Sequence, residues 1–120
     1  MQSKPVLITG ATGYVGRRLV KKILESGYPV RAAVRSPKKF TGRYENRPDN
    51  LEVVQADLLD LDSIVSAARG CGTAYYLVHS LTSAREFSRL ERQCAQHMAI
   101  AADKGGLERM IYLGGLGQHQ

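Results

Sequence analysis

The chain has 120 residues, 43% of them hydrophobic and 23% charged, which suits a single domain, residues 1–120, with a buried core. No apolar run approaches the roughly 20 residues that span a bilayer, and the start MQSKPVLITG lacks the apolar segment of a signal peptide. A membrane partner is therefore not expected, and two cysteines, Cys71 and Cys94, favour reduced thiols in the cytoplasm over a disulfide. The net charge is +6, and most of the excess lies between Arg31 and Arg47.

Short β-type runs alternate with helical patterns along the chain. The runs predict strands over Val6–Thr9, Val30–Val34, Leu51–Gln55, Ala74–Val78 and Arg109–Leu113. Between them we expect a helix over Tyr14–Ser26, a loop with one short helical turn over 36–50, a helix capped by Asp60, and a long helix that starts in a capping box at Ser83–Glu86, with residues 117–120 as a tail. This alternation predicts a Rossmann-type α/β fold, a doubly wound parallel sheet in strand order 3-2-1-4-5.

The first strand ends in a glycine-rich turn, in the run VLITGATGYVG. Gly10 allows the sharp turn, Gly13 lets the backbone approach a pyrophosphate, and Gly16 lets the following helix pack closely on the strand. We expect the N–H groups of Gly13, Tyr14 and Val15 to be unpaired and to face the anion at the positive end of the helix. The alternative is a tight turn without a ligand, but the strand before it and the helix after it favour a dinucleotide. The predicted pyrophosphate contacts are Gly10, Thr12, Gly13, Tyr14, Val15 and Gly16.

The second strand is followed by Arg35, at the carboxyl edge of the sheet where the ligand crevice of such folds lies. An acidic residue here would bind the ribose diol of NAD, whereas an arginine accommodates the 2′-phosphate of NADP with paired, charge-assisted bonds. Ser36 adds a hydroxyl, and Lys38 and Lys39 add positive potential. We therefore expect NADP, with NAD as the alternative, although the pattern is also compatible with a surface arginine that has no ligand. A nucleic-acid partner is not expected, because no aromatic-interleaved basic stripe accompanies the charge.

The spacing G-x-x-G-x-x-G, the preceding Thr9 and the string TGATGYVG resemble the short-chain dehydrogenase/reductase superfamily. The chain is most similar to the extended and atypical members, which are epimerase-like and NmrA-like NAD(P)-binding proteins, and the string IYLGGLG resembles the atypical members as well. The resemblance implies that Asp57 binds the adenine amino group through its side chain, with backbone help from Leu58. Related members tend to have asparagine where this chain has His97, so the chain departs from the family's polar contact at this position, and the alternative is a helix-face histidine bonded to backbone.

The string YYLVHS resembles the family's fourth-strand end, where backbone contacts dominate. The resemblance therefore implies that Val78, His79 and Ser80 line the nicotinamide ribose, and that His79 lines the cofactor rather than acting as an acid or base. No metal site is expected, because the histidines and cysteines have none of the spacings of a zinc site.

Catalysis in this superfamily uses a Tyr-x-x-x-Lys pair, and none of the 6 tyrosines here begins such a pair. Glycines also follow the fifth strand where catalytic members have serine or threonine. We therefore assign no catalytic residue and expect the N-terminal, cofactor-binding half of an NADP-dependent oxidoreductase or an epimerase- or dehydratase-like protein, inactive by itself. The alternative is a non-catalytic NADP-binding regulatory or structural module, as in NmrA-like proteins. The fifth strand, which further elements cover in the family, is expected to be an exposed edge that pairs in a homo-oligomer.

Overall fold

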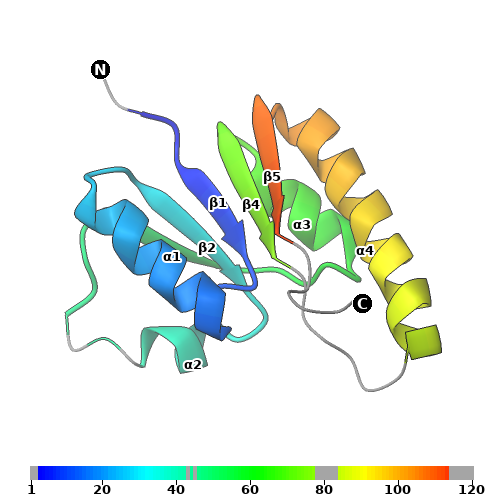
Figure 1. Ribbon diagram of the computed structural model, residues 1–120. Coiled ribbons are helices and arrows are strands. Elements are labelled where there is room, and N and C mark those ends of the chain that lie inside the picture. Colours follow the sequence, from blue (N-terminus) through cyan, green and yellow to red (C-terminus); the bar gives the residue numbers. More distant parts are fainter. Residues whose placement is uncertain (1–2, 43, 45, 78–83, 114–120) are drawn as a thin grey trace.

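A computed structural model describes residues 3–42, 44, 46–77 and 84–113, with the side chains of 84–88 excepted (Figure 1). The strands form one parallel sheet in the order β3-β2-β1-β4-β5, so the predicted doubly wound topology is confirmed. The strands are β1 (Val6–Thr9), β2 (Val30–Val34), β3 (Leu51–Gln55), β4 (Thr73–Leu77) and β5 (Arg109–Leu113).

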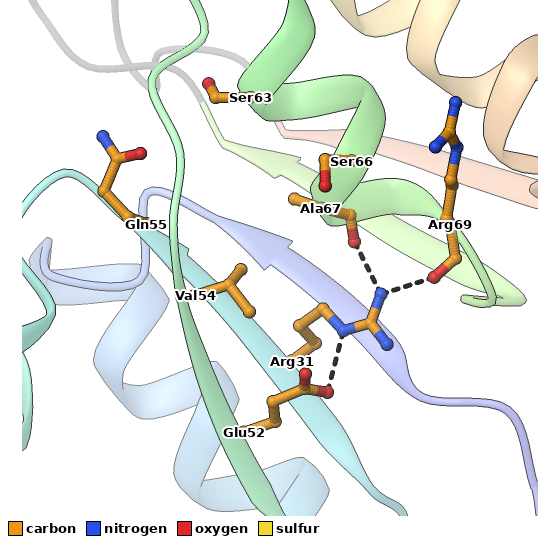
Figure 2. A pocket seen from close by; sticks show the side chains of 8 residues that line it. All are labelled: Arg31, Glu52, Val54, Gln55, Ser63, Ser66, Ala67 and Arg69. Carbon is orange, nitrogen blue, oxygen red and sulfur yellow. Dashed lines mark hydrogen bonds and ion pairs between the residues drawn. The ribbon is translucent and has the colours of Figure 1, made fainter.

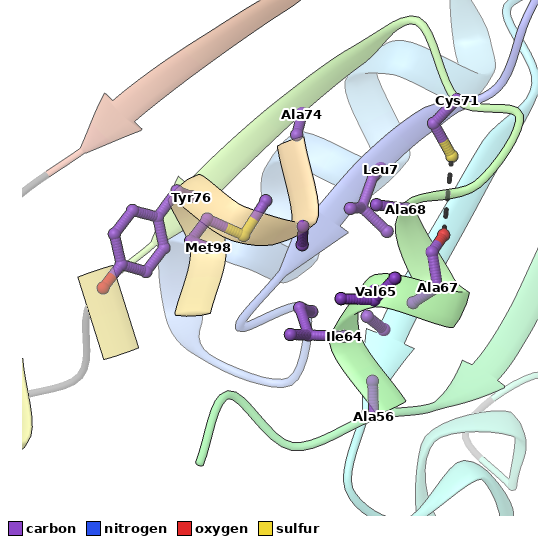
Figure 3. Close-up of a cluster of buried hydrophobic side chains, with 12 residues drawn as sticks. Leu7, Ala56, Ile64, Val65, Ala67, Ala68, Cys71, Ala74, Tyr76 and Met98 are labelled. Carbon is purple, nitrogen blue, oxygen red and sulfur yellow. Dashed lines mark hydrogen bonds between the residues drawn. The ribbon is translucent and has the colours of Figure 1, made fainter. Parts of the chain in front are cut away.

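Helices cover both faces of this sheet (Figure 1). They are α1 (Tyr14–Glu25), α2 (Pro37–Thr41), α3 (Leu61–Ala68) and α4 (Ala84–Gly105). Successive residues of a strand point to opposite faces, so Ile8 packs in the cluster of α1 and α2, whereas Leu7 packs in the cluster of α3 and α4. Figure 3 shows the second cluster, in which Ile64 of α3 and Met98 of α4 gather over Leu7. Two apolar layers therefore hold the sheet from either side.

The boundaries differ from the sequence-based expectation at a few positions. β4 begins one residue earlier than expected, at Thr73, and its expected last residue, Val78, lies outside the described residues. The short helical turn expected after the second strand is α2, and α1 ends at Glu25 with Ser26 as its C-cap. The capping box at 83–86 rests on Ser83, which also lies outside the described residues, as does the tail at 117–120.

The two edges of the sheet are β3 and β5, and β5 is the more open of the two. Its side chains Met110, Tyr112 and Leu113 are 41%, 52% and 38% exposed. Within the described residues β5 pairs only with β4, which leaves one side of its backbone unpaired. None of the helices in the described residues combines the length and the apolar composition that a bilayer crossing requires.

Candidate cofactor site

The glycine turn follows β1 directly and has the geometry that its glycines predict. Gly10 has a φ of 68°, a left-handed conformation that glycine adopts without steric cost. A Cβ placed on Gly16 would lie 2.1 Å from the carbonyl oxygen of Gly10 and 2.8 Å from the Cα of Ala11. The conformational roles predicted for Gly10 and Gly16 are therefore confirmed: one makes the turn, and the other lets α1 touch it.

The amide of Gly13 is not free, which corrects one part of the prediction. Its N–H donates to the Gly10 carbonyl at 3.1 Å and closes the turn. The first helical bond runs from the N–H of Arg17 to the Gly13 carbonyl at 2.9 Å, so the N–H groups of Tyr14, Val15 and Gly16 come before the helical ladder. The set of amides open to an anion is therefore shifted by one residue along the chain.

The start of α1 is electrostatically suited to an anion. Its first turn contains no acidic residue that would neutralise the positive end of the helix. Thr12, Tyr14 and Val15 are exposed, and the guanidinium of Arg18 stacks over the Tyr14 ring at 4.3 Å from its centroid. The turn therefore offers an anion three amides that have no acceptor among the described residues, and its first helical turn adds no opposing carboxylate.

Thr9 joins the ends of β1 and β4, a role that the sequence reasoning missed. The side chain is only 2% exposed, and its Oγ1 accepts a hydrogen bond from the Leu77 N–H at 3.2 Å while donating to the Tyr75 carbonyl at 3.4 Å. The strand order reverses between β1 and β4, and ligands of doubly wound sheets bind at this point. The polar Thr9 at the end of the otherwise apolar run VLIT is the sequence signal that would have indicated this link between the two strands.

Arg35 stands where the sequence predicted, immediately after β2 at the carboxyl edge of the sheet. It is exposed, and no ion pair joins it to a carboxylate among the described residues. Ser36 is the N-cap of α2, but its side chain makes no capping bond, so its hydroxyl is available to a ligand. Lys38 and Lys39 on α2 are exposed as well. This corner therefore presents several positive charges and a hydroxyl, and none of the described carboxylates forms an ion pair with them.

Arg31 does not belong to this basic corner, although the sequence grouped it there. Figure 2 shows its guanidinium turned toward α3, where Nε donates to Glu52 at 2.8 Å and Nη1 donates to the carbonyls of Ala67 and Arg69 at 2.8 and 2.5 Å. It holds the C-terminal end of α3 and lines a surface pocket of about 450 Å³. None of the predicted cofactor contacts lines that pocket.

The loop after β3 carries Asp57 and Leu58 and is closed by side-chain bonds. Asp57 accepts the N–H of Leu59 on Oδ1 at 2.9 Å, and its own N–H donates to Ser63 Oγ at 2.9 Å. The Ser63 hydroxyl lies 2.8 Å from the Asp60 carbonyl, to which it donates. Asp60 occupies the N-cap of α3, but its side chain makes no capping bond, so the predicted capping role of this carboxylate is wrong. Asp57 and Ser63 order the helix start instead.

His97 makes the polar contact that the sequence left open. Its Nδ1 lies 2.6 Å from the carbonyl oxygen of Leu58, in the loop that the family resemblance assigns to adenine. Met98, the next residue of α4, is fully buried and fixes the rotation of the helix at this point. His97 is therefore bonded to a backbone carbonyl of this loop.

Burial shifts three titratable groups near β4 and α4 away from their ordinary pKa values. Burial raises the pKa of Tyr76 and of both thiols, Cys71 and Cys94. The Tyr76 hydroxyl is buried without a hydrogen-bond partner among the described residues, and its ring packs on Tyr112 with centroids 5.4 Å apart. Both cysteines are free thiols. Raised values keep these groups protonated at neutral pH, so they are poor nucleophiles and bases.

Two further observations complete the description of the site. Val78, His79 and Ser80, the residues predicted to line the nicotinamide ribose, lie outside the described residues. Within the described ranges, no group of three or more histidine, cysteine or acidic side chains is arranged to hold a metal ion.

Three features together define a nucleotide-binding Rossmann domain: the glycine turn, the reversal of strand order between β1 and β4, and the basic corner after β2. Sequence comparison gives its family. The chain belongs to the NAD(P)H-binding family, which matches residues 10–120. The resemblance to the short-chain dehydrogenase/reductase superfamily is thereby confirmed, and the cofactor class is a nicotinamide dinucleotide.

Individual relatives are reductases, and the chain covers a part of each. It is 29% identical to cinnamoyl-CoA reductase 2 of Arabidopsis thaliana over 98% of this chain and 37% of that protein. It is 30% identical to cinnamoyl-CoA reductase 2 of Medicago truncatula over 93% of this chain and 35% of that protein. The chain thus spans roughly a third of the length of these curated relatives.

Solved structures share the fold at lower sequence identity. A Rossmann-fold NAD(P)-binding family protein from Shigella flexneri superposes with a TM-score of 0.75 and 22% identity, over 99% of this chain and 55% of that one. Triphenylmethane reductase from Citrobacter sp. superposes with a TM-score of 0.76 and 22% identity, over 92% of this chain and 37% of that one. These likenesses independently support the sheet order described above.

Proposed function

We propose that the chain binds NADP, and that it is the cofactor-binding half of an NADP-dependent oxidoreductase or of an epimerase- or dehydratase-like protein. The observation that carries the preference for NADP is the exposed Arg35 directly after β2, which forms no ion pair within the described ranges and stands where an NAD-binding protein would have an acid. Ser36 and the two lysines of α2 support a 2′-phosphate at the same corner. The parent reaction would be hydride transfer between the nicotinamide and a substrate carbon, a chemistry that the cofactor itself supplies.

The remaining contacts follow the order of the dinucleotide across the sheet edge. The pyrophosphate would lie on the glycine turn, against the N–H groups of Tyr14, Val15 and Gly16. Adenine would meet the second carboxylate oxygen of Asp57 and the N–H of Leu58, neither of which has a partner among the described residues. The proposed contacts are Gly10, Thr12, Gly13, Tyr14, Val15, Gly16, Arg35, Ser36, Asp57, Leu58, Val78, His79 and Ser80.

The preference for NADP is tested by calorimetric titration of the chain with NADPH and with NADH. The variant Arg35→Ala should lose about 1.5–3 kcal/mol of NADPH affinity, roughly ten- to a hundredfold, because a charge-assisted contact to the 2′-phosphate is removed. Its affinity for NADH should hardly change. The matched control is Arg69→Ala, an exposed arginine next to the C-terminal end of α3, which should leave both affinities unaltered. Equal losses for both cofactors in Arg35→Ala would contradict the assignment.

A second candidate function is a non-catalytic NADP-binding module. It is supported by the glycines Gly114 and Gly115, which follow β5 at the position where catalytic members of the superfamily carry serine or threonine. The two functions differ in turnover with a panel of carbonyl substrates. Hydride transfer by this chain would exclude the non-catalytic module.

The open edge of β5 supports self-association with a second copy of the chain, in a cytoplasmic setting that suits two free thiols. Light scattering tests it, since Leu113→Lys should shift a dimer toward the monomer by placing a charge on the edge. A wild-type chain that stays monomeric at high concentration contradicts self-association.

A further inference from the structure

We propose that His97 is a positioning residue for the adenine end of the cofactor, an inference that rests on the proposed dinucleotide function. The name adenine loop is used here for residues 56–60, between β3 and α3. His97 reaches this loop from α4, a separate element far along the chain, through the 2.6 Å contact between its Nδ1 and the Leu58 carbonyl. Its role is to fix the loop in the shape that recognises the base.

The hydrogen bonds of the adenine loop leave one backbone donor open. The peptide between Asp57 and Leu58 has its carbonyl held by the Asp60 N–H at 2.8 Å. The peptide between Leu58 and Leu59 has its carbonyl held by His97 and its N–H held by Asp57 Oδ1 at 2.9 Å. The Leu58 N–H is the donor without an acceptor in the part of the chain that the structure describes.

This open donor and the second oxygen of Asp57 match one edge of adenine. The 6-amino group of adenine is a donor that a carboxylate oxygen accepts, and the adjacent ring nitrogen is an acceptor for a backbone N–H. Reading both groups requires that the loop hold its donor and its acceptor in a fixed relative position. Such preorganisation is what the bond from His97 contributes.

His97 can hold the loop because α4 itself is anchored. Met98 and Ala101 are fully buried against α3 and the sheet, so the turn of α4 that carries His97 has a fixed position. The acceptor is a carbonyl, so the imidazole must carry its proton on Nδ1. Asparagine has its amide nitrogen at the corresponding Nδ2 position and can make the same bond, whereas leucine cannot.

The test compares NADPH with its hypoxanthine analogue, nicotinamide hypoxanthine dinucleotide phosphate, which lacks the 6-amino group. The ratio of the two dissociation constants, measured by calorimetry, reports base recognition separately from overall affinity. We expect wild type to prefer NADPH about five- to tenfold and His97→Leu to lose most of that preference, because the loop is no longer held. His97→Asn should restore the ratio.

Two controls separate positioning from loss of structure. Gln96→Leu changes the exposed neighbouring residue on α4 and should leave the ratio at the wild-type value. His97→Gln keeps a donor but moves it one carbon further from the helix, so it should lose the preference for NADPH. This variant keeps the test open if His97→Leu fails to fold. A merely structural role of His97 would weaken both nucleotides equally and leave the ratio unchanged.

The outcomes distinguish this inference from the function on which it rests. A folded His97→Leu or His97→Gln chain that keeps the wild-type ratio overturns the positioning role, and so does a wild-type chain that binds both nucleotides equally well. A wild-type chain that binds neither nucleotide overturns the proposed function itself.

Discussion

The glycine turn and the adenine loop lie at the same edge of the sheet, but they are built in different ways. The turn is one run of consecutive residues, 10–16, whose shape comes from glycine conformation and whose donors are backbone amides. The adenine loop takes its shape from side chains, namely Asp57 within the loop, Ser63 on α3 and His97 on α4. The first region is therefore determined locally, and the second only when the chain has folded.

This difference teaches how each region should respond to mutation. A substitution that adds an atom to a closely packed turn disrupts the whole turn, because the new atom collides with backbone that cannot move away. A loop held by several side chains loses one bond at a time, and each bond is worth about 1 kcal/mol. Large effects are therefore expected in the turn, and graded effects around the loop.

The largest effect is expected from Gly16→Ala. The new Cβ would lie 2.1 Å from the Gly10 carbonyl, so α1 must move off the turn, and we expect a loss of about 3 kcal/mol or more in the free energy of unfolding. Denaturant unfolding measures it. Gly27→Ala is the control, because its φ of 91° is strained but no atom lies within 4 Å, and it should cost only about 1–2 kcal/mol. Equal losses would mean that close packing does not distinguish the turn.

The next effect concerns α3, the helix that carries Ser63. Arg31→Met removes the donor to the Ala67 and Arg69 carbonyls and should lower the free energy of unfolding by about 2–3 kcal/mol. Glu52→Gln keeps those two bonds and loses only a half-exposed ion pair, which should cost less than about 1 kcal/mol. Unfolding of both variants under the same conditions checks the order, and a larger loss in Glu52→Gln would contradict it.

Ser63→Ala should cost about 1 kcal/mol, because the Asp57 N–H loses its acceptor, whereas the Asp60 carbonyl keeps the backbone N–H donors of Ser63 and Ile64. It should also weaken NADPH binding, since the adenine loop is less well held. Ser66→Ala is the matched control, an exposed serine on the same helix. If the two variants have the same stability and the same affinity for NADPH, the side-chain account of the loop is wrong.

The smallest predicted effect is a loss of folding stability that appears only at alkaline pH. Burial raises the pKa of Tyr76, and the hydrogen bond to Glu91 raises that of Tyr112. The unfolded chain releases these protons near pH 10, before the folded chain does, so stability is complete below about pH 10 and falls as pH rises toward the folded values. Tyr76→Phe should flatten this fall more than Tyr112→Phe, since Tyr76 is buried and Tyr112 is half-exposed. Unfolding measured from pH 8 to 11 gives the answer.

Much of the molecule was predictable because its signals are local. The strand runs, the order 3-2-1-4-5 and the turn at Gly10 and Gly16 follow from apolar periodicity, right-handed crossovers and glycine conformation. Arg35 was predictable as a residue at a strand end for the same reason. Each of these depends on neighbours within one or two elements of the chain.

The errors arose where partners are distant or where hydrogen bonds must be counted. The Gly13 amide was expected to be free for an anion, but it donates a hydrogen bond within the turn. Arg31 was counted with the basic corner, but it bonds to Glu52 and to the C-terminal end of α3. Asp60 was expected to cap α3, but Ser63 and Asp57 order that start. Composition gives the charge of a segment and not the direction in which each side chain points.

The sequence by itself determined the fold and the place of the glycine turn, since both depend on the backbone preferences of consecutive residues. Only the tertiary structure decided how the adenine loop is held, that Thr9 joins β1 to β4, and that His97 meets Leu58. The physical reason is that a hydrogen bond between distant residues requires both elements to be packed first. No pattern within either segment specifies the other partner.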